Sequence, residues 1–458
     1  MNRPCLFSTF FAALLGLAGS ARGQTAEPTH AYDEPRPQER RQISSEGPEA
    51  PAARRDAPHA RGMTGRDYTY MRCWYRKDAN SLKPGSDYAW ARGTNGDYYR
   101  LRGHWYDNFL FLWRNMFYTD TPRAELEKIC RETLREQGKP DTWFDLHAAD
   151  NGLSFNYLVW TQNKPDGGSR IDRMVSFGDS LSDTMNLHNA TLWAVPHRES
   201  WLLGRFSNGP LWNEQVAAAL GLPLYNWAVA GAAGDQHIVI PGVGEQVDSW
   251  EQYMRAARDY QPARTLFTLW IGGNDLINYG RSPDSVAQHV ETALRELIAQ
   301  GARYVLVMNL PDLTLAPSVR GSGKQAKLAA DIAAYNQKLH AAIERLREQH
   351  GDVHLLLMDN APLLEEVLVD PARHGLRNVS EPCLQIDRSG TLKYAGKYQP
   401  RATCTHADDF FFWDDLHPTT KGHGILAEKV TSFLLGKFPD ELSAVTQSDV
   451  SDKDAKCP

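Results

Sequence analysis

Beyond about residue 170, the chain alternates between short runs of consecutive apolar residues and longer segments in which apolar residues recur every three or four positions. Continuous apolar runs are typical of strands that are buried on both faces, and the longer spacing is typical of amphipathic helices. Strands are expected at 174–177, 265–271, 304–310 and 353–358, and helices at 211–220, 285–300, 325–349 and 418–435. This alternation predicts an α/β fold with a parallel sheet covered by helices.

Residues 67–165 show a different pattern, in which aromatic residues are frequent and short strand-like runs are separated by Gly, Asn and Asp. This pattern predicts an antiparallel sheet with hairpins. Thr121 and Pro122 suit the cap and the first turn of one helix within it. The segment is therefore expected to form a small, mainly β, aromatic-rich N-terminal domain, separated by a turn-rich linker from a second domain at 170–438.

The two ends of the chain lack the pattern of a folded domain. Residues 1–23 combine a basic residue, a short apolar run and small residues at a possible cleavage site, which predicts a signal peptide and a secreted, extracellular protein. Residues 24–66 are rich in Pro, Glu, Arg and Ala, so they are expected to be a disordered linker. Residues 439–458 are polar and are expected to form a flexible tail.

Composition sets further limits on function. The net charge is −6 and the isoelectric point is near 6.2, so there is no basic excess to hold nucleic acid. The chain contains no Cys-x-x-Cys pair and its histidines are scattered, so no metal site is expected. No cofactor is called for either.

Five cysteines remain once the signal peptide is removed: Cys73, Cys130, Cys383, Cys404 and Cys457. An exported protein can form disulfides, although sequence alone does not decide among the three pairings that four cysteines allow. The preferred pairs are Cys73–Cys130 and Cys383–Cys404, because each closes a loop within one region. Cys457 is then left free or available for an intermolecular bond.

Candidate chemistry begins at Ser180, on a turn that follows the first predicted strand of the second domain. Gly178 permits a sharp bend there, and an exposed hydroxyl near a helix N-terminus suits a nucleophile. A serine also needs a base, and His417 follows the carboxylate of Asp414 by three residues. Asn274 comes shortly after another predicted strand and supplies an amide group. Other carboxylates near His417 are rivals to Asp414: Asp408, Asp409 and Asp415.

These pieces, in this order, resemble the four blocks of the GDSL, or SGNH, family of serine esterases and lipases. Ser180 matches the first block, Gly231 the second, Asn274 the third, and Asp414 with His417 the last. The resemblance implies an SGNH-hydrolase three-layer sandwich with a parallel sheet. It also implies a Ser180 nucleophile, a His417 base oriented by Asp414, and an oxyanion hole formed by the Ser180 and Gly231 N–H groups with the Asn274 side chain.

A closer resemblance covers residues 68–438, which are similar to the secreted thermolabile, or lecithin-dependent, hemolysin phospholipases of bacteria. It rests on stretches such as Met71-Arg72-Cys73-Trp74-Tyr75-Arg76 and Gly204-Arg205-Phe206-Ser207-Asn208-Gly209. It implies a phospholipase A or lysophospholipase that acts on phospholipid or a membrane surface. The same subgroup is similar to glycerophospholipid–cholesterol acyltransferases, so cholesterol is a candidate acyl acceptor.

Two other functions remain open from the sequence: an acetylesterase acting on glycans, and a surface-binding module whose esterase site is vestigial. Apolar residues near the blocks are candidates for a groove that binds acyl chains, although core packing explains them equally well. They are Trp193, Trp201, Leu202, Leu203, Phe206, Phe410, Phe411 and Phe412.

Overall fold

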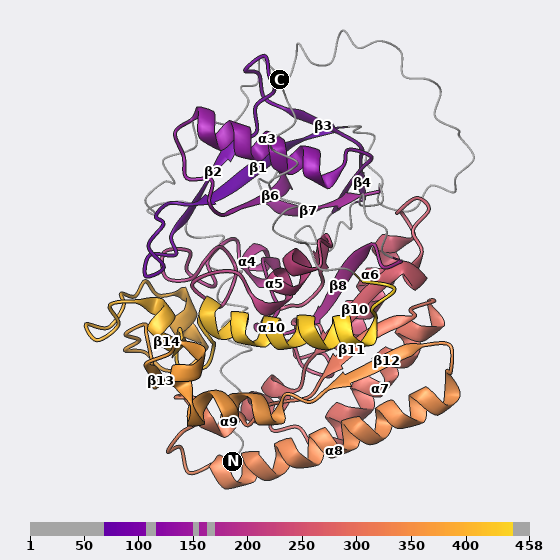
Figure 1. Cartoon of the computed structure of the whole chain (residues 1–458), viewed down its shortest axis with the longest axis vertical. Helices are drawn as coiled ribbons and strands as arrows, with labels where there is room; N and C mark the ends of the chain where they lie inside the picture. Colours follow the sequence, from indigo (N-terminus) through magenta and orange to yellow (C-terminus); the bar gives the residue numbers. More distant parts are fainter. Residues whose placement is uncertain (1–67, 107–115, 150–154, 163–169, 443–458) are drawn as a thin grey trace. The chain divides into compact units, whose positions relative to one another are not determined.

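The computed structural model describes residues 68–106, 116–149, 155–162 and 170–442, which form two compact units (Figure 1). The first unit contains the described residues among 68–75 and 88–160, and the second contains 76–87 and those from 161 onward. Residues 76–87 thus group with the second unit, although the predicted first domain includes them. The expected signal peptide, disordered linker and Cys457 lie outside the described residues.

The N-terminal unit is built on a seven-stranded sheet with the order β2-β1-β6-β7-β5-β4, in which β3 also pairs with β1. Strand β1 runs antiparallel to both β3 and β6, and β4 runs antiparallel to β5, as the hairpin pattern predicts. The strands are β1 (Tyr68–Arg76), β2 (Ser86–Trp90), β3 (Arg100–Arg102), β4 (His104–Tyr106), β5 (Met116–Thr119), β6 (Phe144–Ala149) and β7 (Asn156–Thr161).

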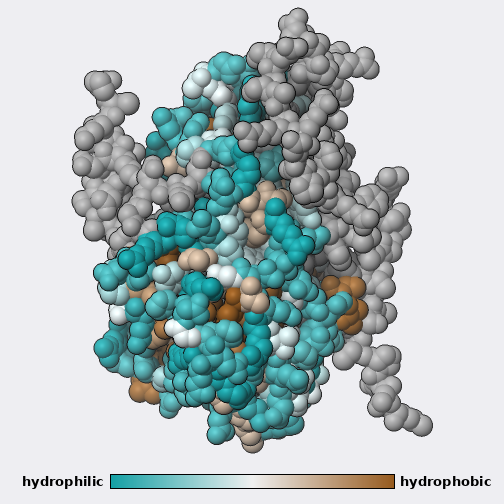
Figure 2. All heavy atoms as spheres, turned by 90° about the vertical axis from the view of Figure 1, so that its right-hand side faces the viewer, coloured by the Kyte–Doolittle hydropathy of each residue, from teal (hydrophilic) through white to brown (hydrophobic). Residues whose placement is uncertain are grey.

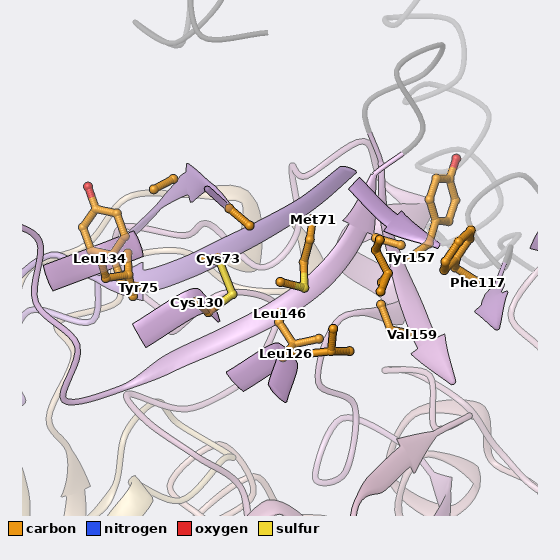
Figure 3. Close-up of a cluster of buried hydrophobic side chains, with 14 of the residues drawn as sticks. Met71, Cys73, Tyr75, Phe117, Leu126, Cys130, Leu134, Leu146, Tyr157 and Val159 are labelled. Atoms are coloured by element: carbon orange, nitrogen blue, oxygen red, sulfur yellow. A yellow bond between two sulfur atoms is a disulfide. The ribbon is translucent and has the colours of Figure 1, made fainter. Parts of the chain in front are cut away.

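One helix, α3 (Arg123–Glu136), packs on this sheet and closes the core of the unit (Figure 3). Its buried residues Leu126 and Leu134 belong to the same cluster as Met71 of β1 and Leu146 of β6. The Cys73–Cys130 disulfide joins β1 to α3 inside this core. The predicted Thr121 cap is wrong: Pro122 occupies the cap position without a side-chain bond, and the Thr121 hydroxyl accepts a hydrogen bond from Thr119.

The second unit is built on a five-stranded parallel sheet with the order β12-β11-β10-β8-β9. Four of its strands are those that the apolar runs predict. The fifth, β9, is only three residues long and has no such run. The strands are β8 (Arg173–Gly178), β9 (Leu224–Asn226), β10 (Thr265–Trp270), β11 (Tyr304–Met308) and β12 (His354–Met358).

Helices cover this sheet: α7 packs against α6 and α8, whereas α10 packs against α5 and crosses in front of the sheet in Figure 1. The expected three-layer α/β fold is therefore confirmed. The four predicted helices are present, together with three that the sequence pattern does not predict. They are α4 (Asn186–Ala190), α5 (Trp212–Ala219), α6 (Val243–Met254), α7 (Pro283–Ala299), α8 (Gln325–Gln349), α9 (Ala361–Val369) and α10 (Thr420–Lys437).

Two short parallel strands, β13 (Asn378–Pro382) and β14 (Phe410–Phe412), stand apart from the main sheet. The second preferred disulfide, Cys383–Cys404, closes the segment between them. Strand β14 leads directly to Asp414 and His417. On the face of the molecule that Figure 2 shows, the surface is mainly hydrophilic, and hydrophobic side chains form a few small patches, one of them in a depression.

Candidate active site

The Ser180 turn follows β8 at a point where the backbones of β8 and β10 approach closely. A Cβ atom at Gly178 would lie 2.7 Å from the Trp270 carbonyl oxygen on β10, so only glycine fits there. The Gln246 side chain on α6 accepts a hydrogen bond from the Gly178 N–H and donates one to its carbonyl, both at 2.9 Å. The strand end is thereby held, and Ser180 is only partly buried at the carboxyl edge of the sheet.

Two aspartates brace this turn. Asp179 accepts a hydrogen bond from the Leu181 N–H at 3.0 Å. Asp183 accepts bonds from the N–H groups of Met185, Asn186, Leu187 and Ala230. Burial raises the pKa of Asp179 and of Asp183 to about 6, although these N–H groups favour the carboxylates. The two aspartates therefore fix the backbone around Ser180.

His417 lies within hydrogen-bonding distance of both Ser180 and Asp414. Its Nε2 atom is 2.8 Å from the Ser180 Oγ, and its Nδ1 atom is 2.9 Å from each carboxylate oxygen of Asp414. The Trp413 N–H donates to the His417 carbonyl at 2.8 Å, which closes a tight loop between β14 and α10. This loop lets Asp414 and His417, three residues apart, face one another.

The Asp414 carboxylate accepts further hydrogen bonds, from the N–H groups of Leu416 and His417 at 2.9 and 2.8 Å and from the Trp201 indole at 3.0 Å. Burial alone would raise the pKa of Asp414. The adjacent His417 ring, its hydrogen bonds and nearby Lys393 outweigh burial and hold this pKa at about 2. Asp414 therefore carries a negative charge at neutral pH.

Two of the three rival carboxylates have other partners. Asp415 pairs with Lys393, at 2.7 Å for the longer of two contacts, and Asp409 lies 3.6 Å from Arg377. Asp408 and Asp409 form a short helical turn before β14. The geometry thus separates Asp414 from its three neighbours, which sequence spacing alone does not do.

Asn274 presents its amide group toward the Gly231 loop. The Asn274 Nδ2 donates to the Ala232 carbonyl at 3.0 Å, and its Oδ1 accepts from Asn278 at 2.8 Å. Because Asn278 occupies the oxygen, the NH₂ group is the one that faces the loop, and one of its two hydrogens remains to meet a ligand.

Gly231 is held between residues that are bonded to the other two blocks. Its neighbour Ala230 donates to Asp183, and its neighbour Ala232 accepts from Asn274. Gly231 has a φ of +84°, in the left-handed region that favours glycine. Within the described ranges, the N–H groups of Ser180 and Gly231 have no hydrogen-bond acceptor. Both groups are therefore available to donate to a ligand.

A π-helical turn, Asp275–Tyr279, follows Asn274 and ties it to the Gly231 loop. The Tyr279 hydroxyl donates to the Gly231 carbonyl at 2.7 Å, and the Asp275 carboxylate accepts from the Gly234 N–H at 2.9 Å. Single-turn π-helices occur frequently at functional sites. Sequence inspection missed this role of Tyr279, because neither spacing nor polarity marks a hydroxyl whose partner is 48 residues away.

An apolar pocket opens beside Ser180, Asn274 and His417, which all line it. Part of its apolar wall comes from α9, α10 and β14, which contribute Leu363, Leu364, Val367, Phe411, Phe412, Ile425 and Leu426.

The expected groove residues fall into two groups. Phe411 and Phe412 line the pocket, but the prediction is wrong for Trp201, Leu202, Leu203, Phe206 and Phe410, which are buried in the core, and for Trp193, which lines a separate surface depression. The sequence does not reveal where these side chains pack, because the loops around them are far apart along the chain. Among the described residues, no group of three His, Cys, Asp or Glu side chains is placed to hold a metal ion, and no helix is long and apolar enough to cross a membrane.

The family model for the GDSL-like lipase/acylhydrolases matches residues 174–430, more than half of the chain. The chain belongs to this family and is a carboxylic ester hydrolase with a lipolytic function. Residues 38–162 match a second model, the N-terminal domain of the Vibrio dual lipase/transferase.

Individual proteins are also similar to this chain. The thermolabile hemolysin of Vibrio parahaemolyticus is 40% identical over 368 residues, which cover 79% of this chain and 87% of the relative. The phosphatidylcholine-sterol acyltransferase of Aeromonas hydrophila is 27% identical over 61% of this chain and 95% of its own length. Among solved structures, the carbohydrate acetylesterase Est24 of Sinorhizobium meliloti is 15% identical, with a TM-score of 0.33, over 58% of this chain and 100% of its own.

Proposed function

We propose that this protein is a secreted phospholipase A or lysophospholipase, which hydrolyses carboxyl esters of glycerophospholipids through an acyl-serine intermediate. The observation that carries the proposal is the hydrogen-bonded series Ser180–His417–Asp414 at the side of an apolar pocket. A polar substrate would gain nothing from that pocket, whereas each methylene of an acyl chain buried in it contributes about 0.8 kcal/mol. The name and 40% identity of the Vibrio hemolysin support the same substrate class.

In the proposed reaction, His417 Nε2 takes the proton of Ser180 as its Oγ attacks the ester carbonyl. The carbonyl oxygen becomes an oxyanion that accepts hydrogen bonds from the Ser180 and Gly231 N–H groups and from the Asn274 NH₂ group. The tetrahedral intermediate collapses, the C–O bond to the alcohol breaks, and His417 returns the proton to the leaving oxygen. A water molecule, activated in the same way, then releases the fatty acid and restores Ser180.

A second outcome of the acyl-serine has its own support. If a sterol hydroxyl replaces water in the last step, the product is a sterol ester rather than a fatty acid. The similarity to a phosphatidylcholine-sterol acyltransferase over 95% of that protein's length favours this candidate. The acyl-serine, the oxyanion donors and the acyl pocket would be the same in both reactions.

Export of the protein belongs to the same proposal. The described residues contain two disulfides, Cys73–Cys130 and Cys383–Cys404, and such bonds persist in oxidising compartments outside the cytosol. This supports the predicted signal peptide at 1–23, and we retain the domain limits 67–165 and 170–438 as part of the proposal.

Fatty-acid release from phosphatidylcholine liposomes, with and without cholesterol, tests the function directly. We expect free fatty acid from liposomes without sterol, because the pocket beside Ser180 is apolar and suits an acyl chain. Cholesteryl ester formed in the presence of sterol would establish the transferase as the main activity. Release of acetate from acetylated glycans together with no release from any phospholipid would reject both lipid activities.

Replacing Tyr279 with Phe removes only the hydroxyl that holds the Gly231 carbonyl. We expect kcat to fall about tenfold with little change in KM, because a displaced oxyanion donor weakens the transition state more than the bound substrate. Steady-state kinetics on a soluble ester separate the two constants. A matched control is Tyr260→Phe, whose hydroxyl bonds Thr265 away from the site; an equal loss of kcat in this variant would contradict the positioning role of Tyr279.

A further inference from the structure

Large apolar side chains are exposed on three loops of the second unit. Leu192 is 54% exposed, Ile238 and Val239 are 45% and 47% exposed, and Leu392 is 50% exposed. Most other large apolar residues among those described are buried, and Val369 on α9 is the remaining one with such exposure. Scattered exposed apolar residues are ordinary on a protein surface. These four indicate a function only if their loops are connected to the candidate site.

Ile238 and Val239 form the tip of a tight turn. His237 and Ile240 close it with two backbone hydrogen bonds of 2.9 and 3.0 Å. Ile238 has a φ of +57°, a left-handed conformation that is a genuine outlier for a β-branched residue. Such strain is concentrated at functional sites. An exposed, strained isoleucine has no structural benefit that Asn or Gly would not provide better.

The same turn is attached to the oxyanion loop. The His237 ring stacks on Tyr279 with 3.7 Å between centroids, and Tyr279 donates to the Gly231 carbonyl. Ile240 packs against Gly231 so closely that a Cβ there would lie 3.0 Å from its Cδ1. The Ile238–Val239 tip therefore projects from a segment that contacts the candidate site directly.

The loops that carry Leu192 and Leu392 are also connected to the candidate site. Leu192 also has a left-handed φ, of +53°, and the chain that follows it enters a buried cluster. That cluster contains Val195, Phe206 and Ala230, packed against Leu187, Ala194 and Tyr394. The rings of Phe206 and Tyr394 lie 5.0 and 5.6 Å from the His417 ring, measured between centroids. Leu392 is two residues from Tyr394.

Positive charge lies between the Leu192 and Leu392 loops. Arg198 and Lys397 line a surface depression together with Trp193. The Glu199 carboxylate in the same depression is already paired with Lys77 at 2.6 Å, and in the described part of the chain Arg198 and Lys397 have no carboxylate within ion-pair distance. A local cationic excess on a chain of net charge −6 suits an anionic surface.

We propose that Leu192, Ile238, Val239 and Leu392, with Arg198 and Lys397, form a docking surface for a phospholipid bilayer that contains anionic lipid. The proposal deepens the phospholipase function and rests on it. Apolar tips would enter the boundary between headgroups and acyl chains, while the two cations would contact lipid phosphates. Because Ile240 contacts Gly231 and Tyr394 contacts His417, docking would bring the candidate site to the lipid surface.

Vesicle binding in a Ser180→Ala background tests the docking surface without turnover. In cosedimentation with vesicles of phosphatidylcholine and phosphatidylglycerol, we expect the added changes Ile238→Asn and Val239→Ser to weaken binding about tenfold or more. Asn tolerates the left-handed conformation at 238, so the melting temperature should not fall because of that change. Val369→Ser removes an even more exposed apolar side chain from α9 and should leave binding unchanged.

A second variant tests the charge. Lys397→Gln should weaken binding several-fold to vesicles with phosphatidylglycerol and leave binding to pure phosphatidylcholine vesicles unchanged. Unchanged binding in the Ile238/Val239 variant, or an equal loss in Val369→Ser, would overturn the docking surface. Hydrolysis of a monomeric short-chain phosphatidylcholine by the wild-type protein is measured in parallel. Its absence would overturn the phospholipase function instead, so the two failures are distinguishable.

Discussion

Replacing Ser180 with Ala should lower kcat on any ester by about 10⁵-fold while the protein stays folded. The hydroxyl oxygen that lies 2.8 Å from His417 Nε2 is then lost, and water alone must attack. Ser180 is only partly buried, and the His417 ring that loses this partner lines the pocket, so the change is expected to cost little stability. The rate is measured on a soluble short-chain ester, and the melting temperature is measured on the same preparation.

A neighbouring serine provides the control for this variant. Ser182 is buried two residues away and its hydroxyl accepts a hydrogen bond from the Trp212 indole at 3.2 Å. Ser182→Ala should lose some stability, about 1 kcal/mol, but retain most activity per folded molecule. Labelling by a fluorophosphonate should occur on Ser180 and disappear in Ser180→Ala. Residual activity in Ser180→Ala above a tenth of wild type would reject the acyl-serine mechanism.

The elements of the second unit that sequence predicts well are those with strong local patterns. The apolar run of β10 and the amphipathic period of α8 are each sufficient to identify an element. Strand β9 escapes prediction because three residues carry no period, and its place in the sheet depends on pairing with β8. Helix α9 is not predicted from the sequence, because its apolar face lines a pocket and does not make a long contact with the core.

The site divides in the same way. Asp414 and His417 are close in sequence, and the structure places the His417 Nδ1 atom 2.9 Å from each Asp414 carboxylate oxygen, although spacing alone does not distinguish Asp414 from its three rivals. Trp201 donates to Asp414 from 213 residues away, so its expected place in a groove rests on hydrophobicity alone and misses the hydrogen bond. Contacts of this length become predictable only when the three-dimensional fold is given.

Replacing Asp414 with Asn should lower kcat by about 10⁴-fold with little change in KM. A neutral amide can donate to His417 Nδ1, which would favour the tautomer with the ring proton on Nε2. In that tautomer, Nε2 cannot accept the proton of Ser180. The substitution also removes the charge that stabilises the imidazolium in the transition state. Asp414 is charged because its folded-state pKa is about 2, below the usual value, so its contribution to stability is present at neutral pH and is lost as pH falls toward 2.

Asp415 makes the comparison stringent, because it is adjacent in sequence, carries the same charge and pairs with Lys393 rather than His417. Asp415→Asn should destabilise the fold, since it leaves the nearly buried Lys393 without its partner, yet keep kcat per folded molecule within about tenfold of wild type. Kinetics and thermal unfolding of both variants, measured side by side, separate the two roles. If the two changes lowered kcat equally, Asp414 would not be the residue that orients His417, and the hydrogen bonds at 2.9 Å would have only a structural role.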